Sequence, residues 1–312
     1  MPDSVTAAGS SPPRLSPMRL WTLAARPKTL WAAVAPVVLG GALAWEADLF
    51  HALAWGCAFL GAVFIQIGTN FANDYHDFLL GADTERRVGP TRVTQAGLAT
   101  PQAVRRAAIL MFALATLAGA YLMVRGGWPI VIVGVASLAC GWLYTAGRKS
   151  LAYLGIADLF VFVFFGPVAV GGTYYVQAAD LVGGAALPLV VLLAGVGPGL
   201  LSTAILLANN LRDLETDAAA GKRTLVVRLG RRAGVAMYAA WVLLGVLWPL
   251  VLAYGFDAPM GALLGCLALP LVLGPIRTLA RTDDPATIAP VLGATARALL
   301  VYSVLLAVGW NL

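Results

Sequence analysis

Charge is scarce in this sequence, and cysteine and histidine are scarcer still. Asp, Glu, Lys and Arg make up 12% of the 312 residues, about half the fraction that is usual in a soluble globular domain. The three cysteines lie far apart in apolar runs without a CxxC pair, and the chain has only two histidines. These shortages argue against a soluble domain, a disulfide scaffold and a zinc site.

Long hydrophobic runs stand where the charges are missing. The chain is 60% hydrophobic and its mean hydropathy is +0.83. The runs do not alternate between apolar and polar residues, so they indicate helices rather than the strands of a β-barrel. We expect an all-α integral membrane protein of about nine transmembrane helices in a single bundle, near 29–46, 52–73, 103–124, 128–145, 156–177, 186–209, 232–255, 259–277 and 289–310.

The two ends of the chain and its basic residues predict an orientation. Residues 1–18 are rich in Pro, Ser and Ala and lack the apolar core of a secretory signal, so we expect a disordered tail followed by one domain, 19–312. Basic residues gather before the first span and after every second one, whereas the other connections hold only Arg125. This one-sidedness predicts an N-in, C-out topology, and it explains the net charge of +6 without a nucleic-acid partner.

The first of two acidic patches, NFANDYHDFLLGADTERR, follows the second apolar run directly. On a helix, Asn70, Asp74 and Asp77 lie at i, i+4 and i+7 and share a face, and Asn73 stands one turn before Asp77. The end of this helix therefore presents a column of oxygen ligands. Acids at the edge of a membrane are functional candidates, because burying them is costly.

The second patch, NNLRDLETDAAAGKRTLVVRLG, closes the sixth run. Asn209, Asp213 and Asp217 follow one another at steps of four. Carboxylates repel each other unless a cation intervenes, and Mg²⁺ prefers carboxylates together with substrate phosphates. Basic residues follow both patches, so the sequence predicts a diphosphate site that faces the cytoplasm. The alternatives are solvated loops and a membrane transporter or lipid-binding protein.

At these motifs the sequence resembles the UbiA superfamily of intramembrane prenyltransferases. NDYHD matches the first Asp-rich motif of that superfamily and NNLRDLETD the second. The resemblance implies nine helices around a central cavity and a prenyl diphosphate held through Mg²⁺. The implied metal ligands are Asn73, Asp74, Asp77, Asp83, Asn209, Asp213 and Asp217. The implied diphosphate ligands are Asn70, Asn73, Arg86, Arg92, Lys149, Asn209, Lys222 and Arg223.

Within the superfamily the chain looks most like the branch that prenylates 1,4-dihydroxy-2-naphthoate. The 4-hydroxybenzoate branch usually has an Asp four residues after its NDxxD motif, where this chain has Gly81, with Asp83 two residues later. The resemblance implies transfer of a polyprenyl group with loss of CO₂ in a cell membrane, giving demethylmenaquinol. The alternative within the superfamily is another aromatic acceptor, such as 4-hydroxybenzoate or homogentisate.

A third segment, YTAGRKSLAYLGIAD, enters the membrane from the same side as both patches. Asp158 stands just inside the fifth run, where an acid is costly unless it is paired or functional. We expect Asp158 to act in catalysis, together with Asp74, Asp77, Asp213 and Asp217. Arg148 and Tyr144 are candidates for orienting the aromatic acceptor. Membrane anchoring and topology remain the alternative roles of these basic and aromatic side chains.

Overall fold

Helices account for the regular structure throughout the described part of the chain. A computed structural model describes residues 15–81, 89, 91–147, 150–179 and 187–312. The elements are α1 (Pro17–Ala25), α2 (Pro27–Glu46), α3 (Ala52–Leu79), α4 (Pro101–Leu143), α5 (Leu151–Leu154), α6 (Ala157–Phe164), α7 (Pro167–Ala178), α8 (Leu189–Ala194), α9 (Val196–Arg212), α10 (Leu214–Ala219), α11 (Leu225–Leu229), α12 (Arg231–Gly255), the 3₁₀ helix η1 (Met260–Ala268), α13 (Leu269–Arg281) and α14 (Pro285–Trp310).

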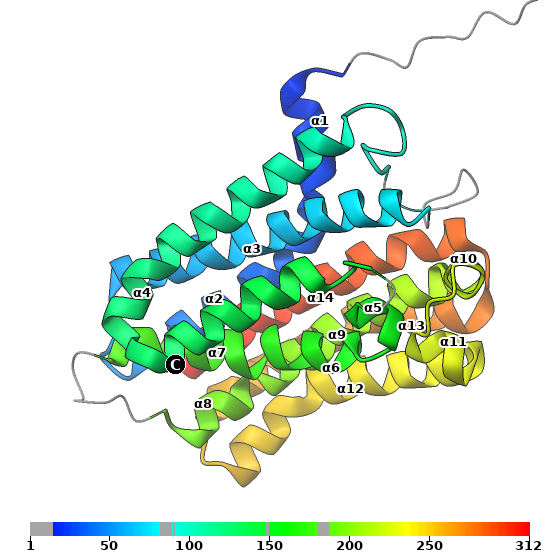
Figure 1. Ribbon diagram of the computed structural model, residues 1–312. Coiled ribbons are helices and arrows are strands. Elements are labelled where there is room, and N and C mark those ends of the chain that lie inside the picture. Colours follow the sequence, from blue (N-terminus) through cyan, green and yellow to red (C-terminus); the bar gives the residue numbers. More distant parts are fainter. Residues whose placement is uncertain (1–14, 82–88, 90, 148–149, 180–186) are drawn as a thin grey trace, which may run out of the picture.

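Helix α4 is two membrane spans joined at Gly127. Its 43 residues would be about 65 Å long as one straight helix, twice the roughly 30 Å of a hydrocarbon core. Gly127 has φ 67° and ψ −158°, a conformation almost confined to glycine. The helix folds back on itself there (Figure 1). This break confirms the expected separation between residues 124 and 128.

Eight helical segments among the described residues are long and apolar enough to cross a membrane, and α4 is one of them. Because α4 folds back at Gly127, the eight segments correspond to nine crossings, as the sequence predicts. Three of the spans are interrupted helices, namely α6 with α7, α8 with α9, and η1 with α13.

Two of the interrupted spans cross where each is broken. A Cβ atom on Gly166 would lie 2.6 Å from the carbonyl oxygen of Gly195, and one on Gly195 would lie 2.7 Å from the carbonyl carbon of Gly166. Only residues without a side chain permit this approach, as is usual where helices pack closely in a membrane. The contact holds α6 and α7 against α8 and α9, which carries the second acidic patch at its end.

The core of the described residues consists of two main clusters and a minor one, which joins α3, α4 and α7 around Leu122 and Val176. The larger cluster joins α2, α7, α9, α12, α13 and α14, with Leu39, Leu201 and Leu299 fully buried. A smaller cluster joins α1, α3 and the first half of α4 around Phe71 and Val104. The helices run roughly along one long axis, and α5, α10 and α11 lie together at one end (Figure 1).

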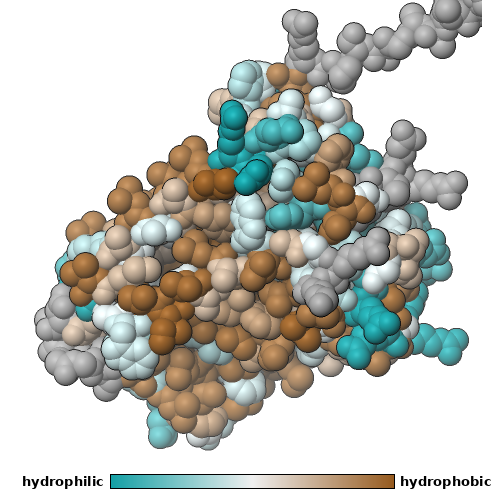
Figure 2. All heavy atoms as spheres, in the orientation of Figure 1, coloured by the Kyte–Doolittle hydropathy of each residue, from teal (hydrophilic) through white to brown (hydrophobic). Residues whose placement is uncertain are grey.

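The surface of the bundle is apolar where a membrane would meet it. Large hydrophobic side chains such as Leu117, Ile132 and Leu250 are exposed on the long helices. Hydrophobic residues cover most of the visible face, and hydrophilic ones gather toward the end that carries α1, α10 and α11 (Figure 2). The spans and this surface identify a multi-pass membrane protein.

Residues 1–14 of the predicted tail, 1–18, lie outside the described residues. Its last residues are not extended chain, because α1 already begins at Pro17 and Ser16 caps it by accepting a hydrogen bond from the Arg19 backbone N–H at 3.4 Å. Helix α1 packs the Trp21 ring against Phe71 of α3 at 5.5 Å between ring centroids. Residues 17 and 18 are therefore helical.

An odd number of crossings in the described part of the chain places the start of α2 and the end of α14 on opposite sides of the membrane. We expect a reporter fused after Leu312 and one fused ahead of α1 to report opposite compartments. A reporter inserted at Gly127 should report the compartment of the C-terminal reporter, because α4 turns back there. Identical locations for the two terminal reporters would contradict the division of α4.

Candidate functional site

A cavity of about 420 Å³ lies between α3, α4 and the rest of the bundle. Along α3 its lining forms one stripe of mostly small residues, Ala58, Gly61, Ala62, Ile65, Gln66, Thr69, Asn70, Asn73 and Asp77. These positions recur every three or four residues, so they lie on one face of the helix over about 28 Å. The cavity is therefore apolar for most of its length and polar at the end where α3 carries the first acidic patch.

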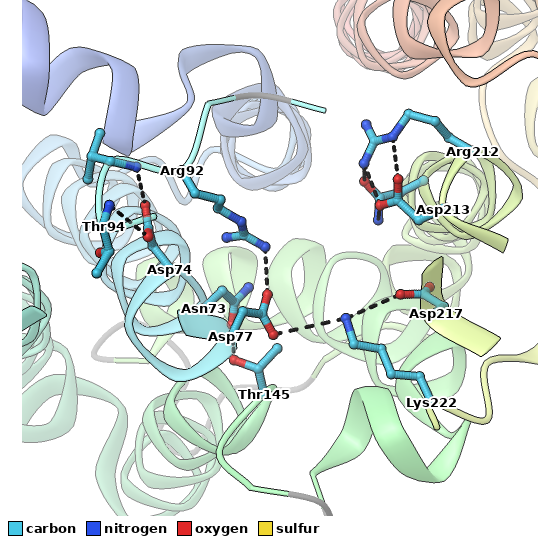
Figure 3. A network of polar contacts seen from close by, with 12 residues as sticks. Asn73, Asp74, Asp77, Arg92, Thr94, Thr145, Arg212, Asp213, Asp217 and Lys222 are labelled. Atoms are coloured by element: carbon cyan, nitrogen blue, oxygen red, sulfur yellow. Dashed lines mark hydrogen bonds and ion pairs between the residues drawn. The ribbon is translucent and has the colours of Figure 1, made fainter. Parts of the chain in front are cut away.

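Asp77 carries the negative charge of the first patch into the cavity. It is 2% exposed, and its Oδ2 lies 2.6 Å from the Nη2 atom of Arg92, which is also buried. Both side chains line the cavity. Arg92 comes from the segment between α3 and α4, so this ion pair ties that segment to the end of α3 (Figure 3).

Asp74 faces a different environment from Asp77. Its Oδ2 accepts a hydrogen bond from the backbone N–H of Val93 at 2.9 Å, and its Oδ1 accepts one from that of Thr94 at 3.3 Å. It is 1% exposed, and it is not among the described residues that line the cavity. The sequence placed Asp74 among the metal ligands, whereas both of its oxygens bind backbone here.

The two asparagines of the first patch also differ. Asn70 lines the cavity but donates hydrogen bonds to the carbonyl of Ala25 at 2.9 Å and to the Thr29 hydroxyl at 3.0 Å. It thereby fixes the junction of α1 and α2. The Oδ1 of Asn73 accepts a hydrogen bond from Thr145 at 2.9 Å, and both of these side chains line the cavity. Asn73 is therefore the better placed of the two to meet a ligand beside Asp77.

In the second patch Asp213 is held by the residue before it. The guanidinium of Arg212 donates to Oδ1 of Asp213 at 2.7 Å and to Oδ2 at 2.6 Å, and it also reaches Oδ1 of Asn209 at 2.8 Å. Such a two-point Arg–carboxylate pair is strong and fixes the orientation of the acid. Asn209 and Asp213 line the cavity opposite the first patch.

Lys222 joins the two patches. Its Nζ atom lies 3.2 Å from Oδ1 of Asp217 and 4.0 Å from Oδ1 of Asp77 (Figure 3). It also lies 5.7 Å from the centre of the Tyr153 ring. Like charges that lie close together need a cation between them, and here a lysine supplies it. The diphosphate role predicted for Lys222 agrees with its place in the cavity lining.

Burial alters the protonation of this pair. Burial raises the pKa of Asp217 to about 6. The positive charge of Lys222 lowers this pKa, and the negative charge of Asp213 raises it further. Burial by itself would lower the pKa of Lys222, but the carboxylates of Asp77 and Asp217 raise it above its usual value. Near neutral pH the lysine is charged and Asp217 is mostly ionised. The pKa of Asp217 nevertheless lies closer to neutral pH than that of an exposed acid.

Tyr144 lines the cavity at the end of α4, beside the acids of both patches. Burial, together with the charges of Asp158, Asp217 and Asp77, raises its pKa, so the hydroxyl remains a hydrogen-bond donor. Asp158 lies in the first turn of α6 and is 6% exposed. Its Oδ1 makes no hydrogen bond to a described residue. A buried carboxylate oxygen without such a bond is costly and is typical of a functional site.

Four predicted ligands, Asp83, Arg86, Arg148 and Lys149, lie outside the described residues. The side chain of Arg223 is exposed and is not part of the described cavity lining, while its backbone N–H binds the carbonyl of Tyr153 at 3.2 Å. In the sequence, Arg212 is only one of the basic residues after the sixth span whose distribution predicts the topology. The adjacency of Arg and Asp inside NNLRD is the one local signal for its role.

The donor set suits a hard divalent cation. The oxygens that line the polar end come from Asn73, Asp77, Asn209, Asp213 and Asp217, and oxygen ligands of this kind fit Mg²⁺. No group of three or more Asp, Glu, His or Cys side chains among the described residues is arranged to hold a metal ion. Each carboxylate is instead paired with Arg92, Arg212 or Lys222, so a metal would have to bind between groups that already have cationic partners.

Known proteins resemble this chain over most of its length. It is 43% identical over 296 residues to a 1,4-dihydroxy-2-naphthoate octaprenyltransferase of Mycobacterium tuberculosis (strain ATCC 25618 / H37Rv), covering 92% of this chain and 95% of that one. It is 36% identical over 303 residues to the protein of the same name from Escherichia coli (strain K12), covering 95% of this chain and 96% of that one.

Solved structures share the fold. The apo structure of a UbiA homolog from Aeropyrum pernix K1 superposes with a TM-score of 0.67 at 15% identity, covering 90% of this chain and 97% of that one. A UbiA homolog from Archaeoglobus fulgidus bound to DMAPP and Mg²⁺ gives a TM-score of 0.58 at 16% identity, covering 92% and 99%. Residues 33–308 match the UbiA prenyltransferase family. The chain belongs to the UbiA prenyltransferase family.

Proposed function

We propose that this protein transfers a polyprenyl group from a prenyl diphosphate to 1,4-dihydroxy-2-naphthoate, with release of CO₂ and diphosphate. The observation that carries the proposal is a single cavity with three buried carboxylates at one end and an apolar stripe along α3. Relatives named for this reaction, at 43% and 36% identity, support the acceptor. Residues 19–312 form the transferase domain in this proposal.

The polar end of the cavity holds the diphosphate. Asn73 and Asp77 on one side, with Asn209, Asp213 and Asp217 on the other, would hold Mg²⁺. When bound, the metal offsets charge on the leaving diphosphate. Lys222 and Arg92 already lie beside these acids. They exchange a carboxylate partner for a diphosphate oxygen and so stabilise the charge that develops as the group leaves.

The apolar part of the cavity holds the prenyl chain and excludes water. As the allylic C–O bond breaks, its electron pair leaves with the diphosphate, and the prenyl carbon becomes cationic. A dry lining protects this carbon until the electron-rich ring attacks it. The new C–C bond forms at the ring carbon that bears the carboxylate. CO₂ then leaves, and the electron pair of the broken bond restores the aromatic ring.

The acceptor lies between Tyr144 and the diphosphate end of the cavity. The Tyr144 hydroxyl stays protonated and is able to donate a hydrogen bond to the acceptor. Asp158 lies near it and accepts a proton or hydrogen bond from a ring hydroxyl, which makes the ring a better nucleophile. Arg148 and Lys149 follow Tyr144 in the sequence and remain candidates for the acceptor carboxylate and the diphosphate.

The proposed location is the cell membrane, with the polar end of the cavity open to the cytoplasm. The distribution of basic residues supports this orientation, because the acidic patches stand on the same side as the basic connections. The reporter fused after Leu312 should therefore lie outside the cytoplasm.

The reaction itself is tested with the purified protein in detergent or vesicles. We expect prenylated, decarboxylated naphthoate by mass spectrometry when Mg²⁺, a polyprenyl diphosphate and 1,4-dihydroxy-2-naphthoate are all present. EDTA should abolish the product and Mg²⁺ should restore it. Preference for 4-hydroxybenzoate or homogentisate would replace the acceptor and keep the chemistry. Absence of diphosphate release with every donor and acceptor would refute a transferase and favour a transporter or lipid-binding protein.

Binding of Mg²⁺ should weaken as the pH falls through about 6. Burial raises the pKa of Asp217 to about 6, so its neutral form stabilises the metal-free fold at low pH, and this contribution is lost as the pH rises through that value. A metal competes with the proton and binds the ionised form. The rise in melting temperature on adding Mg²⁺ should therefore be larger at pH 7.5 than at pH 5.5.

Two variants separate this acid from others in the chain. Asp217→Asn should remove most of the pH dependence of the Mg²⁺ effect. Asp284→Asn is the matched control, because Asp284 is exposed and caps the N-terminus of α14, a position that Asn also suits. The same Mg²⁺ shift at both pH values in the unsubstituted protein would show that Asp217 does not bind the metal.

Filling the apolar stripe should shorten the donor that the enzyme accepts. Gly61 lines the cavity on α3, about 24 Å from Asp77 along the helix, and a Cβ added there meets no atom within 4 Å. Gly61→Leu should lower kcat/KM for long polyprenyl diphosphates by roughly tenfold or more, as bulk in an apolar pocket does. Short donors that end before this position should be affected less.

Gly56→Leu is the control for this substitution. Gly56 also lies on α3 and has equally open space at its Cβ position, but it is not part of the described cavity lining. We expect it to leave the dependence on donor length unchanged. Equal losses for long and short donors in Gly61→Leu would place the prenyl chain elsewhere.

A further inference from the structure

Asp74 is the acid of the first motif that the proposed chemistry leaves without a task. Its side chain is buried, at 1% exposure, and it is not part of the described cavity lining. Its two oxygens accept hydrogen bonds from the consecutive backbone N–H groups of Val93 and Thr94, at 2.9 and 3.3 Å. Two bonds to adjacent amides resemble the way an acid caps the start of a helix.

The backbone that Asp74 holds is a compact turn. The N–H of Ala96 binds the carbonyl of Arg92 at 2.9 Å, and the N–H of Leu98 binds that of Val93 at 3.0 Å. Gly97 takes the left-handed conformation, with φ 65°, that closes the turn. Asp74 therefore supplies acceptors for the N–H groups at the beginning of the turn, which would otherwise be buried without partners.

The same turn delivers Arg92 to the cavity. Arg92 is 6% exposed, and its Nη2 lies 2.6 Å from Oδ2 of Asp77, one helical turn beyond Asp74 on α3. Two side chains at the end of α3 therefore bind the turn. The Asp74 carboxylate binds the backbone of the turn and is not part of the described cavity lining, whereas Asp77 and the Arg92 guanidinium that it binds both belong to that lining. Figure 3 shows both contacts.

We propose that Asp74 is a positioning residue that places Arg92 for the diphosphate and is not itself a metal ligand. The inference rests on the proposed function for what Arg92 binds, but the grip of Asp74 on the turn stands apart from it. Because Asp74 anchors the backbone of the two residues that follow Arg92, part of the cost of ordering Arg92 is met before the substrate arrives. Loss of the anchor would displace a charged group, and displacement of about 1 Å lowers rates by roughly 100-fold.

Kinetics of single and double variants test the role. Asp74→Ala and Arg92→Ala should each raise the KM for prenyl diphosphate by about 10- to 100-fold. The double variant should be no worse than Arg92→Ala alone, since residues that act through one another are not additive. The Mg²⁺ concentration for half-maximal rate should stay within about threefold of the unsubstituted value in Asp74→Ala and rise strongly in Asp77→Asn.

Hydrogen exchange supplies a readout that does not depend on turnover. In the metal-free protein, peptides covering Val93–Ala99 should exchange faster in Asp74→Ala, while Asp77→Asn should leave the Val93 and Thr94 amides protected. Asp74→Asn keeps one acceptor oxygen, so it should recover part of the protection and part of the donor affinity. It also serves as the variant of choice where Asp74→Ala fails to fold.

The outcomes separate the inference from the proposed function. An unprotected turn in Asp74→Ala supports the anchor even where no naphthoate is prenylated. Additive losses in the double variant, or a Mg²⁺ requirement that rises in Asp74→Asn as it does in Asp77→Asn, would make Asp74 a metal ligand and overturn the proposal. Unchanged exchange of the turn in Asp74→Ala would overturn it as well.

Discussion

Buried carboxylates that must be neutralised at one end of an apolar bundle are the constraint on which this structure depends. Asp77, Asp213 and Asp217 are all at most 7% exposed, and an unpaired charge so placed costs several kcal/mol. Each of the three therefore has a cation within 3.2 Å. Arg92 comes from the segment between α3 and α4, Arg212 from the last turn of α9 and Lys222 from the segment after α10. The polar end of the bundle is therefore organised by charge.

The apolar helices enclose the rest of the cavity. Glycines at the breaks of α6–α7 and α8–α9 bring those spans into backbone contact, and Gly127 turns α4 back so that both of its halves line the cavity. Helix α3 contributes both ends of the site, with Ala58 and Gly61 in the apolar part and Asp77 in the polar part. A lipid-like donor with a charged head matches this division.

The pairing of the buried acids with cations of the same chain affects how a ligand binds. Arg92 and Lys222 pair with acids in the absence of substrate, so a diphosphate and its metal enter by exchanging partners rather than by meeting bare charges. Such exchange keeps the desolvation cost small at each step. It also makes the position of each cation decisive, and the turn held by Asp74 fixes one of them.

The sequence alone determined the membrane spans, the break in α4, the two acidic motifs and the family resemblance, because hydrophobic runs and helical spacing are local properties of the chain. It placed Asp74 and Asp77 on one face, yet only the tertiary structure decided that Asp77 meets Arg92 and Lys222 while Asp74 binds backbone. It also treated Arg212 as a topological charge, although that side chain holds Asp213. Which cation reaches which acid depends on how distant segments pack, and helical periodicity carries no information about that.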